Sequence, residues 1–239
     1  MAQINWPEAV GILQAHVVKL STPRGSGTGF VLPIAPNSNV SIVATAAHVL
    51  DNAHYWEEPI RVQHDYSGKS LLLHANERAV FLKEERDTAA LLFSKGSLPL
   101  PDTPVELVPD EKHLRIGHEV GWLGYPAVAA TTLCFFSGRV SAWLETQRSY
   151  LVDGVAINGV SGGPAFHLHL EKPVVIGVVS AYIPNRATGE TLPGLCVVRD
   201  VQQFQELSKE FATVKEAKTQ ETVQNQPPPP PEKGADGAG

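Results

Sequence analysis

Cysteine is scarce in this sequence, and each of the two that are present stands alone. Only Cys134 and Cys196 occur in 239 residues, so the chain cannot be a disulfide-dense scaffold of the small secreted kind. The two residues could form at most one bridge, and a pair of buried thiols is the simpler expectation. The fold must therefore be held together by an ordinary hydrophobic core, for which the chain is long enough.

Long apolar runs are also missing. The longest, residues 174–182, contains Gly177 and Ser180 and falls well short of the roughly 18 residues that a membrane-spanning helix needs. The first 20 residues lack a basic n-region and carry Glu8 where a secretory signal would be apolar. The sequence therefore predicts a cytoplasmic protein without a membrane segment.

Excess positive charge is absent as well. Lys and Arg number 19 against 25 Asp and Glu, which gives a net charge of -6 and no basic stripe, so nucleic-acid binding is not predicted. His167 and His169 share a face of one segment, but no cysteine or carboxylate completes them at a zinc spacing. The glycine-rich segment 25–29 is not followed by the Lys-Ser/Thr of a phosphate-binding loop. We therefore predict neither a metal nor a cofactor.

What the sequence does contain is a series of short apolar segments separated by Gly, Pro and Asn. This pattern is typical of an antiparallel all-β sandwich or barrel, and long amphipathic helices are nearly absent. Four prolines within residues 95–109 separate two halves. We predict an N-terminal domain, residues 1–105, and a C-terminal domain, residues 106–211, which closes with a short helix that Asp200 caps.

Residues 212–239 differ in composition from everything before them. They are rich in Lys, Glu, Gln and Thr and include five consecutive prolines at 227–231. Such a segment has too little apolar surface to offset the entropy of the chain, so a disordered tail with a short polyproline II stretch is expected. A solubilising tail and a proline-rich ligand both remain open.

The residues most suggestive of chemistry surround Ser161. In the stretch Asn158 to Pro164, glycines at 159, 162 and 163 allow unusual backbone dihedrals and let consecutive amides face outward. A nucleophile needs this arrangement, an exposed hydroxyl beside donors aimed at a developing oxyanion. A glycine-rich turn with an incidental serine is the alternative.

Two further residues make the nucleophile interpretation stronger. His48 stands at the end of the apolar run 41–47, and Asp87 directly precedes the small or apolar residues 88–92. Because of this position, we expect the carboxylate of Asp87 to be half-buried. A half-buried carboxylate needs a hydrogen-bond partner, and a histidine N–H is a suitable one.

In this order, the segments TAAHV, DTAALL and NGVSGGPAF resemble the trypsin-like serine proteases. The segments GSGTGFV before the histidine and GHEVGWLGYP in the second half resemble the HtrA-type branch more closely, and the likeness covers about residues 8–210. The resemblance implies a chymotrypsin-like fold of two six-stranded antiparallel β-barrels with the active site in the cleft between them. A PDZ domain, usual after the protease in that branch, is not expected here.

The resemblance also implies catalytic roles. Ser161 would attack the scissile carbonyl, His48 would take its proton and return it to the leaving amine, and Asp87 would hold His48 in the productive tautomer. The backbone N–H groups of Gly159 and Ser161 would form the oxyanion hole. Val160 stands where secreted zymogens of the family have an aspartate, so activation through an ion pair with a new N-terminus is not expected.

Substrate preference follows from the same resemblance. Val155 would form the base of the primary pocket, with walls from residues 180–182 and from the segment around Gly194. Val155 carries no charge, and Tyr182 stands where a glycine is usual, so we expect cleavage after small or medium apolar residues. The expected substrate-binding residues are Val155, Asn158, Ser180, Ala181, Tyr182 and Gly194.

Three functions are compatible with these observations. The first is a serine endopeptidase acting on a polypeptide substrate. The second is a catalytically silent protease-fold protein that binds partners. The third is a latent effector protease that a regulatory protein partner switches on.

Overall fold

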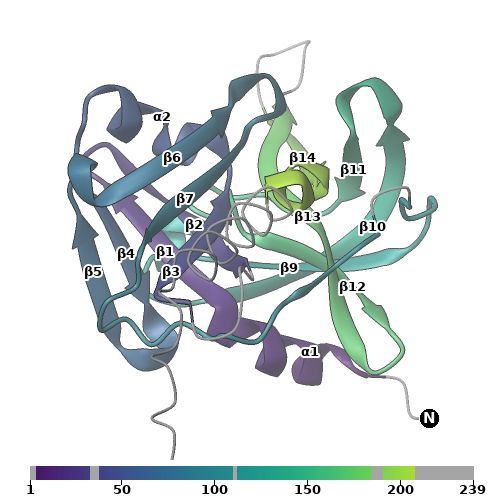
Figure 1. The fold of residues 1–239 in the computed structure, drawn as a ribbon. Helices are drawn as coiled ribbons and strands as arrows, with labels where there is room; N and C mark the ends of the chain where they lie inside the picture. Colours follow the sequence, from purple (N-terminus) through teal and green to yellow (C-terminus); the bar gives the residue numbers. More distant parts are fainter. Residues whose placement is uncertain (1–3, 33–37, 110–111, 185–190, 208–239) are drawn as a thin grey trace, which may run out of the picture.

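The computed structural model describes residues 4–32, 38–109, 112–184 and 191–207, and it is built mostly from β-strands in two sheets. Figure 1 shows the N-terminal sheet in purple and blue beside the C-terminal sheet in teal and green. Within the described part, no helix is long and apolar enough to cross a membrane. The expected tail, residues 212–239, lies outside the described residues.

The N-terminal sheet has seven antiparallel strands in the order β5-β4-β1-β2-β3-β7-β6 and forms a half-barrel. Its strands are β1 Val17–Thr22, β2 Gly25–Leu32, β3 Val40–Thr45, β4 Ile60–His64, β5 Lys69–Leu73, β6 Arg78–Lys83 and β7 Thr88–Ser94. Strands β2, β3 and β7 are buried along almost their whole length, because one face packs inside this sheet and the other packs against the second half.

The C-terminal sheet closes on itself. Its order is β12-β9-β10-β11-β14-β13-β8, and an added pairing of β12 with β13 completes a six-stranded barrel. Its strands are β8 Glu106–Leu107, β9 Glu119–Gly124, β10 Cys134–Leu144, β11 Ser149–Asp153, β12 Pro164–His169, β13 Lys172–Pro184 and β14 Thr191–Asp200. The short β8 pairs parallel to β13, whereas the other strand pairs are antiparallel.

The predicted all-β, two-barrel architecture is therefore confirmed, with one barrel closed and the other forming a half-barrel. The predicted C-terminal helix is present over residues 202–207, and residues beyond 207 are not described. The side chain of Asp200 accepts a hydrogen bond from the backbone of Gln202, as a helix cap does.

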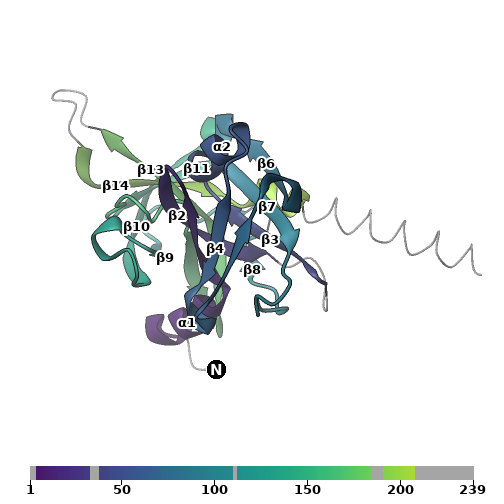
Figure 2. The same ribbon diagram turned by 90° about the vertical axis from the view of Figure 1, so that its left-hand side faces the viewer.

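Two helices were not foreseen. Helix α1, Trp6–Leu13, starts with a capping box between Asn5 and Glu8 and lies beneath the C-terminal barrel (Figure 2). Helix α2, Ala47–Tyr55, follows β3 directly. Both are short, so the apolar spacing that reveals a helix repeats too few times to stand out in the sequence.

One apolar core joins the two halves. Residues of the N-terminal sheet such as Phe30 and Ile42 belong to the same buried cluster as Trp122 and Phe166 of the C-terminal barrel. Phe30 also contacts the ring of Phe204 in the closing helix, with ring centroids 6.3 Å apart. The two halves are thus packed firmly against each other, which fixes the relative position of any residues at their boundary.

Candidate active site

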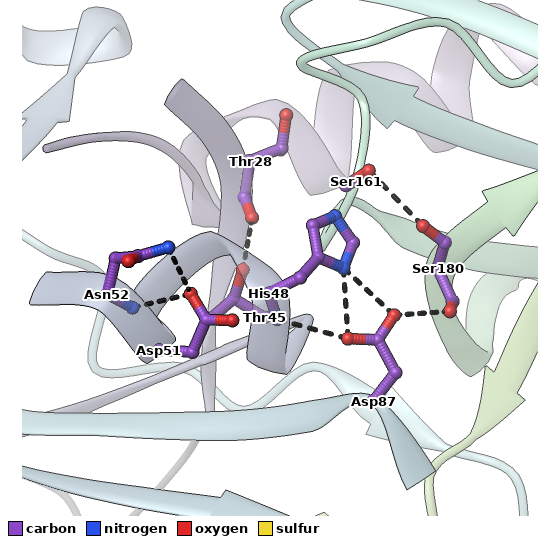
Figure 3. Close-up of polar contacts among 8 residues, drawn as sticks. All are labelled: Thr28, Thr45, His48, Asp51, Asn52, Asp87, Ser161 and Ser180. Atoms are coloured by element: carbon purple, nitrogen blue, oxygen red, sulfur yellow. Dashed lines mark hydrogen bonds and ion pairs between the residues drawn. The ribbon is translucent and has the colours of Figure 1, made fainter. Parts of the chain in front are cut away.

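His48 and Asp87 lie in contact at the boundary of the two halves (Figure 3). The Nδ1 atom of His48 is 2.9 Å from Oδ1 and 3.0 Å from Oδ2 of Asp87. The register of β3 and β7 explains the contact, because Thr45 pairs with Ala89 and so places the start of α2 beside the residue that precedes β7. Two residues that are 39 positions apart are therefore brought together by the pairing of two strands.

Asp87 also completes the N-terminus of α2. The helix has no side-chain cap of its own, since its N-cap residue is Ala46. The backbone N–H of His48 instead donates to Oδ1 of Asp87 at 3.1 Å, so the carboxylate takes one of the amides that a helix start leaves unpaired. The same carboxylate thus binds both the backbone N–H and the imidazole ring of His48.

A third donor reaches Asp87 from the other half of the molecule. The hydroxyl of Ser180, a fully buried residue of β13, donates to Oδ2 of Asp87. Burial by itself raises the pKa of Asp87, but the hydrogen bonds from His48 and Ser180 outweigh it, and the pKa lies below its ordinary value. Asp87 is thus ionised at neutral pH.

The same contact acts on His48 in the opposite direction. The hydrogen bond with Asp87 raises the pKa of His48 above its ordinary value, although burial alone would lower it. The charge of Asp51, on the next turn of α2, raises the pKa of His48 slightly further. The side chain of His48 remains 47% exposed, so its second ring nitrogen is accessible to a substrate. A histidine held in this way is suited to general acid–base catalysis near neutral pH.

Ser161 lies in a tight turn just before β12. Its hydroxyl donates to the backbone oxygen of Ser180 at 3.2 Å, and no hydrogen bond joins it to His48 within the described structure. Gly162, the next residue, has φ +85°, and an added Cβ would lie 2.1 Å from the carbonyl oxygen of Thr28. Only glycine fits here, which explains one of the glycines that the sequence pattern singled out.

The residues before Ser161 form a type II turn. The N–H of Val160 donates to the carbonyl of Ile157 at 3.0 Å, and Gly159 at the third position has φ +93° while Asn158 has an ordinary φ. A type I turn would present the central peptide, and with it the N–H of Gly159, in the opposite direction. The turn type therefore decides where this amide points.

Two anchors hold the peptides that carry the predicted oxyanion donors. The carbonyl of Asn158 accepts from the N–H of Ala127 at 2.7 Å, and that of Val160 accepts from the N–H of Gly163 at 3.0 Å. In a trans peptide the N–H points away from the C=O, so the amides of Gly159 and Ser161 are directed away from these anchors. No acceptor binds either amide among the residues that the structure describes.

Val160 occupies the position where the resemblance led us to note a missing aspartate. Its side chain is fully buried in the shared core, against the backbone of Gly124. The turn is therefore held by apolar packing at this position.

Two hollows flank Ser161. One has a volume of about 440 Å³ and the other about 240 Å³. The larger is lined by His48, Ala156, Ile157, Asn158, Ser161, Ser180 and Ala181. The smaller is lined by Thr22, Arg24, Gly25, Ser26, His48, Val49, Asp51, Asn52, Asn158, Gly159 and Ser161. Both hollows are lined in part by His48, Asn158 and Ser161, so an extended chain bound at Ser161 could reach either of them.

The larger hollow differs in one respect from the expected primary pocket. Val155, predicted as its base, does not line it and is 50% exposed, while Ala156 and Ile157 lie at the wall. The chain leaves β11 through Gly154, which packs against the ring of Trp122, and this turn directs the residues after it. Gly194 lies in β14, but its surroundings and the side chain of Tyr182 lie outside the described residues.

Two buried hydroxyls near the site escaped the sequence analysis. Thr28 of β2 bonds to the turn before Ser161, and Thr45 of β3 bonds to Thr28. Ser180 was assigned only to the pocket wall, and its bond to Asp87 was not foreseen. The segment Gly-Ser-Gly-Thr-Gly was noted only for its family resemblance and for its lack of a phosphate-binding signature, and nothing local shows which partner a threonine meets across an interface.

Cys134 and Cys196 are both free thiols. Burial raises the pKa of Cys196 to about 12, so this thiol stays protonated. In the described parts of the chain, no group of three or more His, Cys, Asp or Glu side chains could hold a metal ion.

Comparisons with known proteins identify the family and the fold. The family model of the trypsin-like peptidase domain matches residues 27–178, which is more than half of the chain. No curated protein sequence matches significantly.

Two solved structures share the fold. A serine endoprotease from Yersinia pestis has a TM-score of 0.64 at 16% identity, covering 89% of this chain and 68% of that one. Deg5 has a TM-score of 0.61 at 18% identity, covering 85% of this chain and 94% of that one. At these identities the likeness concerns the fold, and the family model carries the assignment: this chain belongs to the trypsin-like peptidase domain family.

Proposed function

We propose that this protein is a serine endopeptidase that cleaves peptide bonds through Ser161, His48 and Asp87. The observation that carries the proposal is the position of His48, which is bonded through Nδ1 to Asp87 and lines the same two hollows as Ser161. The bond to Asp87 fixes the tautomer in which Nε2 of His48 is free to accept a proton.

The reaction would proceed in two halves. Ser161 Oγ attacks the carbonyl carbon of the scissile bond while its proton passes to Nε2 of His48, and the resulting oxyanion accepts hydrogen bonds from Gly159 and Ser161. His48 then gives the proton to the leaving amine, and the C–N bond breaks to leave an acyl-enzyme. Water repeats these steps, with His48 again as base, and releases the acid and Ser161.

The serine must turn before it can react. In the resting arrangement its hydroxyl donates to the backbone oxygen of Ser180. Ser161 lies beside the ring of His48 (Figure 3), and we expect a rotation about χ1 to bring the hydroxyl to it. Hydrogen bonds of this kind often tighten only in the complex with substrate. The absence of a serine–histidine bond among the described residues is thus compatible with an active enzyme.

The expected substrate is a polypeptide with a small or medium apolar residue before the cut. Ala156, Ile157 and Ala181 line the larger hollow, and none of its lining residues other than His48 is ionisable. The backbone of residues 180–182, in β13, would pair with the substrate as an added strand.

The experiment combines a fluorophosphonate probe with a peptide library. The purified protein should label at Ser161 and cleave library peptides after apolar residues, and Ser161→Ala should do neither. Absence of both labelling and cleavage in the wild type would contradict the proposal.

The resting hydrogen bond of Ser161 with Ser180 favours one second candidate, a latent protease that a protein partner activates. Labelling in buffer and in cell lysate separates the two. A constitutive enzyme labels equally in both, whereas a latent one labels only with lysate, and a silent binding protein labels in neither.

A further inference from the structure

The hydroxyl of Thr28 connects the two halves of the molecule at the oxyanion turn. Thr28 lies within β2 of the N-terminal sheet and is fully buried. Its Oγ1 donates to the carbonyl of Gly159 at 2.8 Å and accepts from the N–H of Tyr125 at 3.0 Å. Both partners belong to the C-terminal half.

The direction of these bonds is fixed by chemistry. A backbone N–H can only donate, so the oxygen of Thr28 must be the acceptor toward Tyr125. The single hydroxyl hydrogen of Thr28 is then left for the carbonyl of Gly159. The side chain therefore has one orientation in which both buried backbone groups are satisfied.

The backbone of Thr28 holds the same turn at a second point. Its N–H donates to the carbonyl of Ser161 at 2.8 Å. Its own carbonyl accepts from the hydroxyl of Thr45 at 2.7 Å (Figure 3). Thr28 thus binds the carbonyls of Gly159 and Ser161, while Ala127 and Gly163 bind the two others between Asn158 and Ser161. All four carbonyls from Asn158 to Ser161 are held, and Thr28 supplies the one side-chain donor among the described residues.

Gly159 needs such an anchor more than another residue would. Lacking a Cβ, glycine populates positive and negative φ about equally, so the residue itself does little to keep the type II turn. The peptide after Gly159 is held at two points: its N–H donates to the carbonyl of Ile157 within the turn, and its carbonyl accepts from Thr28. Among the described residues, the bond from Thr28 is the one that ties this peptide to the N-terminal half. Without the hydroxyl, this buried carbonyl would lose its partner, and rotation of the turn would become a way to regain one.

We propose that Thr28 is a positioning residue for the proposed peptidase: its hydroxyl holds the Gly159 carbonyl so that the amides of Gly159 and Ser161 face the oxyanion. The inference rests on the proposed function. It predicts that loss of the hydroxyl weakens stabilisation of the transition state more than binding of the substrate, because the amides act where charge develops during the reaction.

The test compares three variants of the full chain. Thr28→Val removes the hydroxyl at nearly constant volume, and Thr28→Ser restores it. Thr45→Val is the matched control, because Thr45 is also fully buried and also donates one short bond to a backbone carbonyl, yet it does not touch Gly159. Thr28→Ala takes the place of Thr28→Val if the valine variant does not fold.

For a library peptide that the wild type cleaves, Thr28→Val should lower kcat about 10- to 100-fold and leave KM nearly unchanged. The expected decrease is smaller than that for complete loss of an oxyanion donor, because the amides remain present but are less well positioned. Thr28→Ser should keep kcat within about threefold of wild type, since it offers the same donor and acceptor. Thr45→Val should lower thermal stability as much as Thr28→Val but leave kcat much closer to wild type. Wild-type kcat in Thr28→Val, or an equal loss in Thr45→Val, would overturn the inference.

A second readout does not depend on activity. Hydrogen exchange of peptides covering residues 157–163 should be faster in Thr28→Val than in wild type and Thr45→Val. A wild type that neither cleaves peptides nor reacts with the fluorophosphonate overturns the proposed function. In that case the exchange comparison still decides whether Thr28 holds the turn, and equal exchange in all variants refutes it.

Discussion

The two halves of the molecule contribute to the site in different states of assembly. The N-terminal half carries His48 and Asp87, which already share a hydrogen bond at 2.9 Å. The C-terminal half carries Ser161, whose hydroxyl donates to Ser180 within its own barrel. The proposed acid–base pair is thus already hydrogen-bonded, whereas the hydroxyl of the proposed nucleophile is bonded to the backbone of Ser180.

The contact of His48 with Asp87 and the position of Ser161 relative to His48 depend on different interactions. The contact of His48 with Asp87 follows from the pairing of β3 and β7 in one sheet, so ladder hydrogen bonds determine it. The relation of Ser161 to His48 spans the boundary between the halves. There it depends on a few cross-boundary hydrogen bonds, among them those from Ser180 to Asp87 and from Thr28 to Gly159.

The largest expected effect comes from the nucleophile of the C-terminal half. Ser161→Ala should reduce kcat by about 10⁶-fold, because no other group forms the acyl-enzyme. Peptide hydrolysis measures the loss, and circular dichroism checks that the variant is folded. Hydrolysis at the wild-type rate would show that the nucleophile lies elsewhere.

The acid–base pair of the N-terminal half comes next. Asp87→Asn should lower kcat about 10⁴-fold, because the amide favours the wrong tautomer of His48. Glu85→Gln, an exposed carboxylate of the same turn, serves as the control and should behave as wild type. Equal activity of Asp87→Asn and Glu85→Gln would show that Asp87 does not orient His48 for catalysis.

Gly159 and Gly68 compare the halves directly. Both have positive φ, +93° and +69°, but a Cβ on Gly159 would lie 2.3 Å from the carbonyl oxygen of Tyr125, whereas Gly68 has open space. Gly159→Ala should lower kcat about 10²- to 10³-fold, as for a lost oxyanion donor. Gly68→Ala should lower stability by about 1–2 kcal/mol through backbone strain alone and leave kcat unchanged. Equal kcat in the two variants would argue against a role of the turn.

Ser180 tests the contacts between the two halves, because its hydroxyl donates from β13 to Asp87 of the N-terminal half. Ser180→Ala should lower kcat/KM about tenfold, since a hydrogen bond to a charged group contributes about 1.5–3 kcal/mol. Ser149→Ala is the matched control, as Ser149 is also buried and its hydroxyl has no partner among the described residues. A decrease of similar size in both variants would assign the effect to general packing.

The smallest expected effect is a shift in pH dependence. The pKa of His48 is raised, so the protonated form, which cannot act as base, persists to higher pH, and kcat/KM should fall as the pH drops through a value above 6.5. Removing the carboxylate in Asp87→Asn should move this acid limb to lower pH. An acid limb that stays in place would mean that Asp87 does not set the charge state of His48.

Much of this arrangement could be predicted from residue types and their order. The apolar segments indicated an all-β chain, and His48, Asp87 and Ser161 were singled out together by their sequence contexts. The glycines around Ser161 correctly indicated unusual backbone dihedrals, since Gly159 and Gly162 have positive φ and a side chain at either would meet backbone atoms. Each of these features depends on local chain chemistry, which the sequence displays directly.

The contacts between distant segments could not be predicted from the sequence, because they depend on the tertiary structure. Helix α2 starts without a cap of its own because Asp87, 39 residues later, supplies the acceptor. Val155 is half-exposed and does not line the hollow that Ala156 and Ile157 line.

The roles of Thr28 and Ser180 exist only because the two halves pack along a shared core. The order of residues thus indicated which groups are available for chemistry and roughly where strands form. The partner that each buried hydroxyl or carboxylate meets was set by strand register and barrel packing, because a hydrogen bond depends on positions in space that a linear order does not specify.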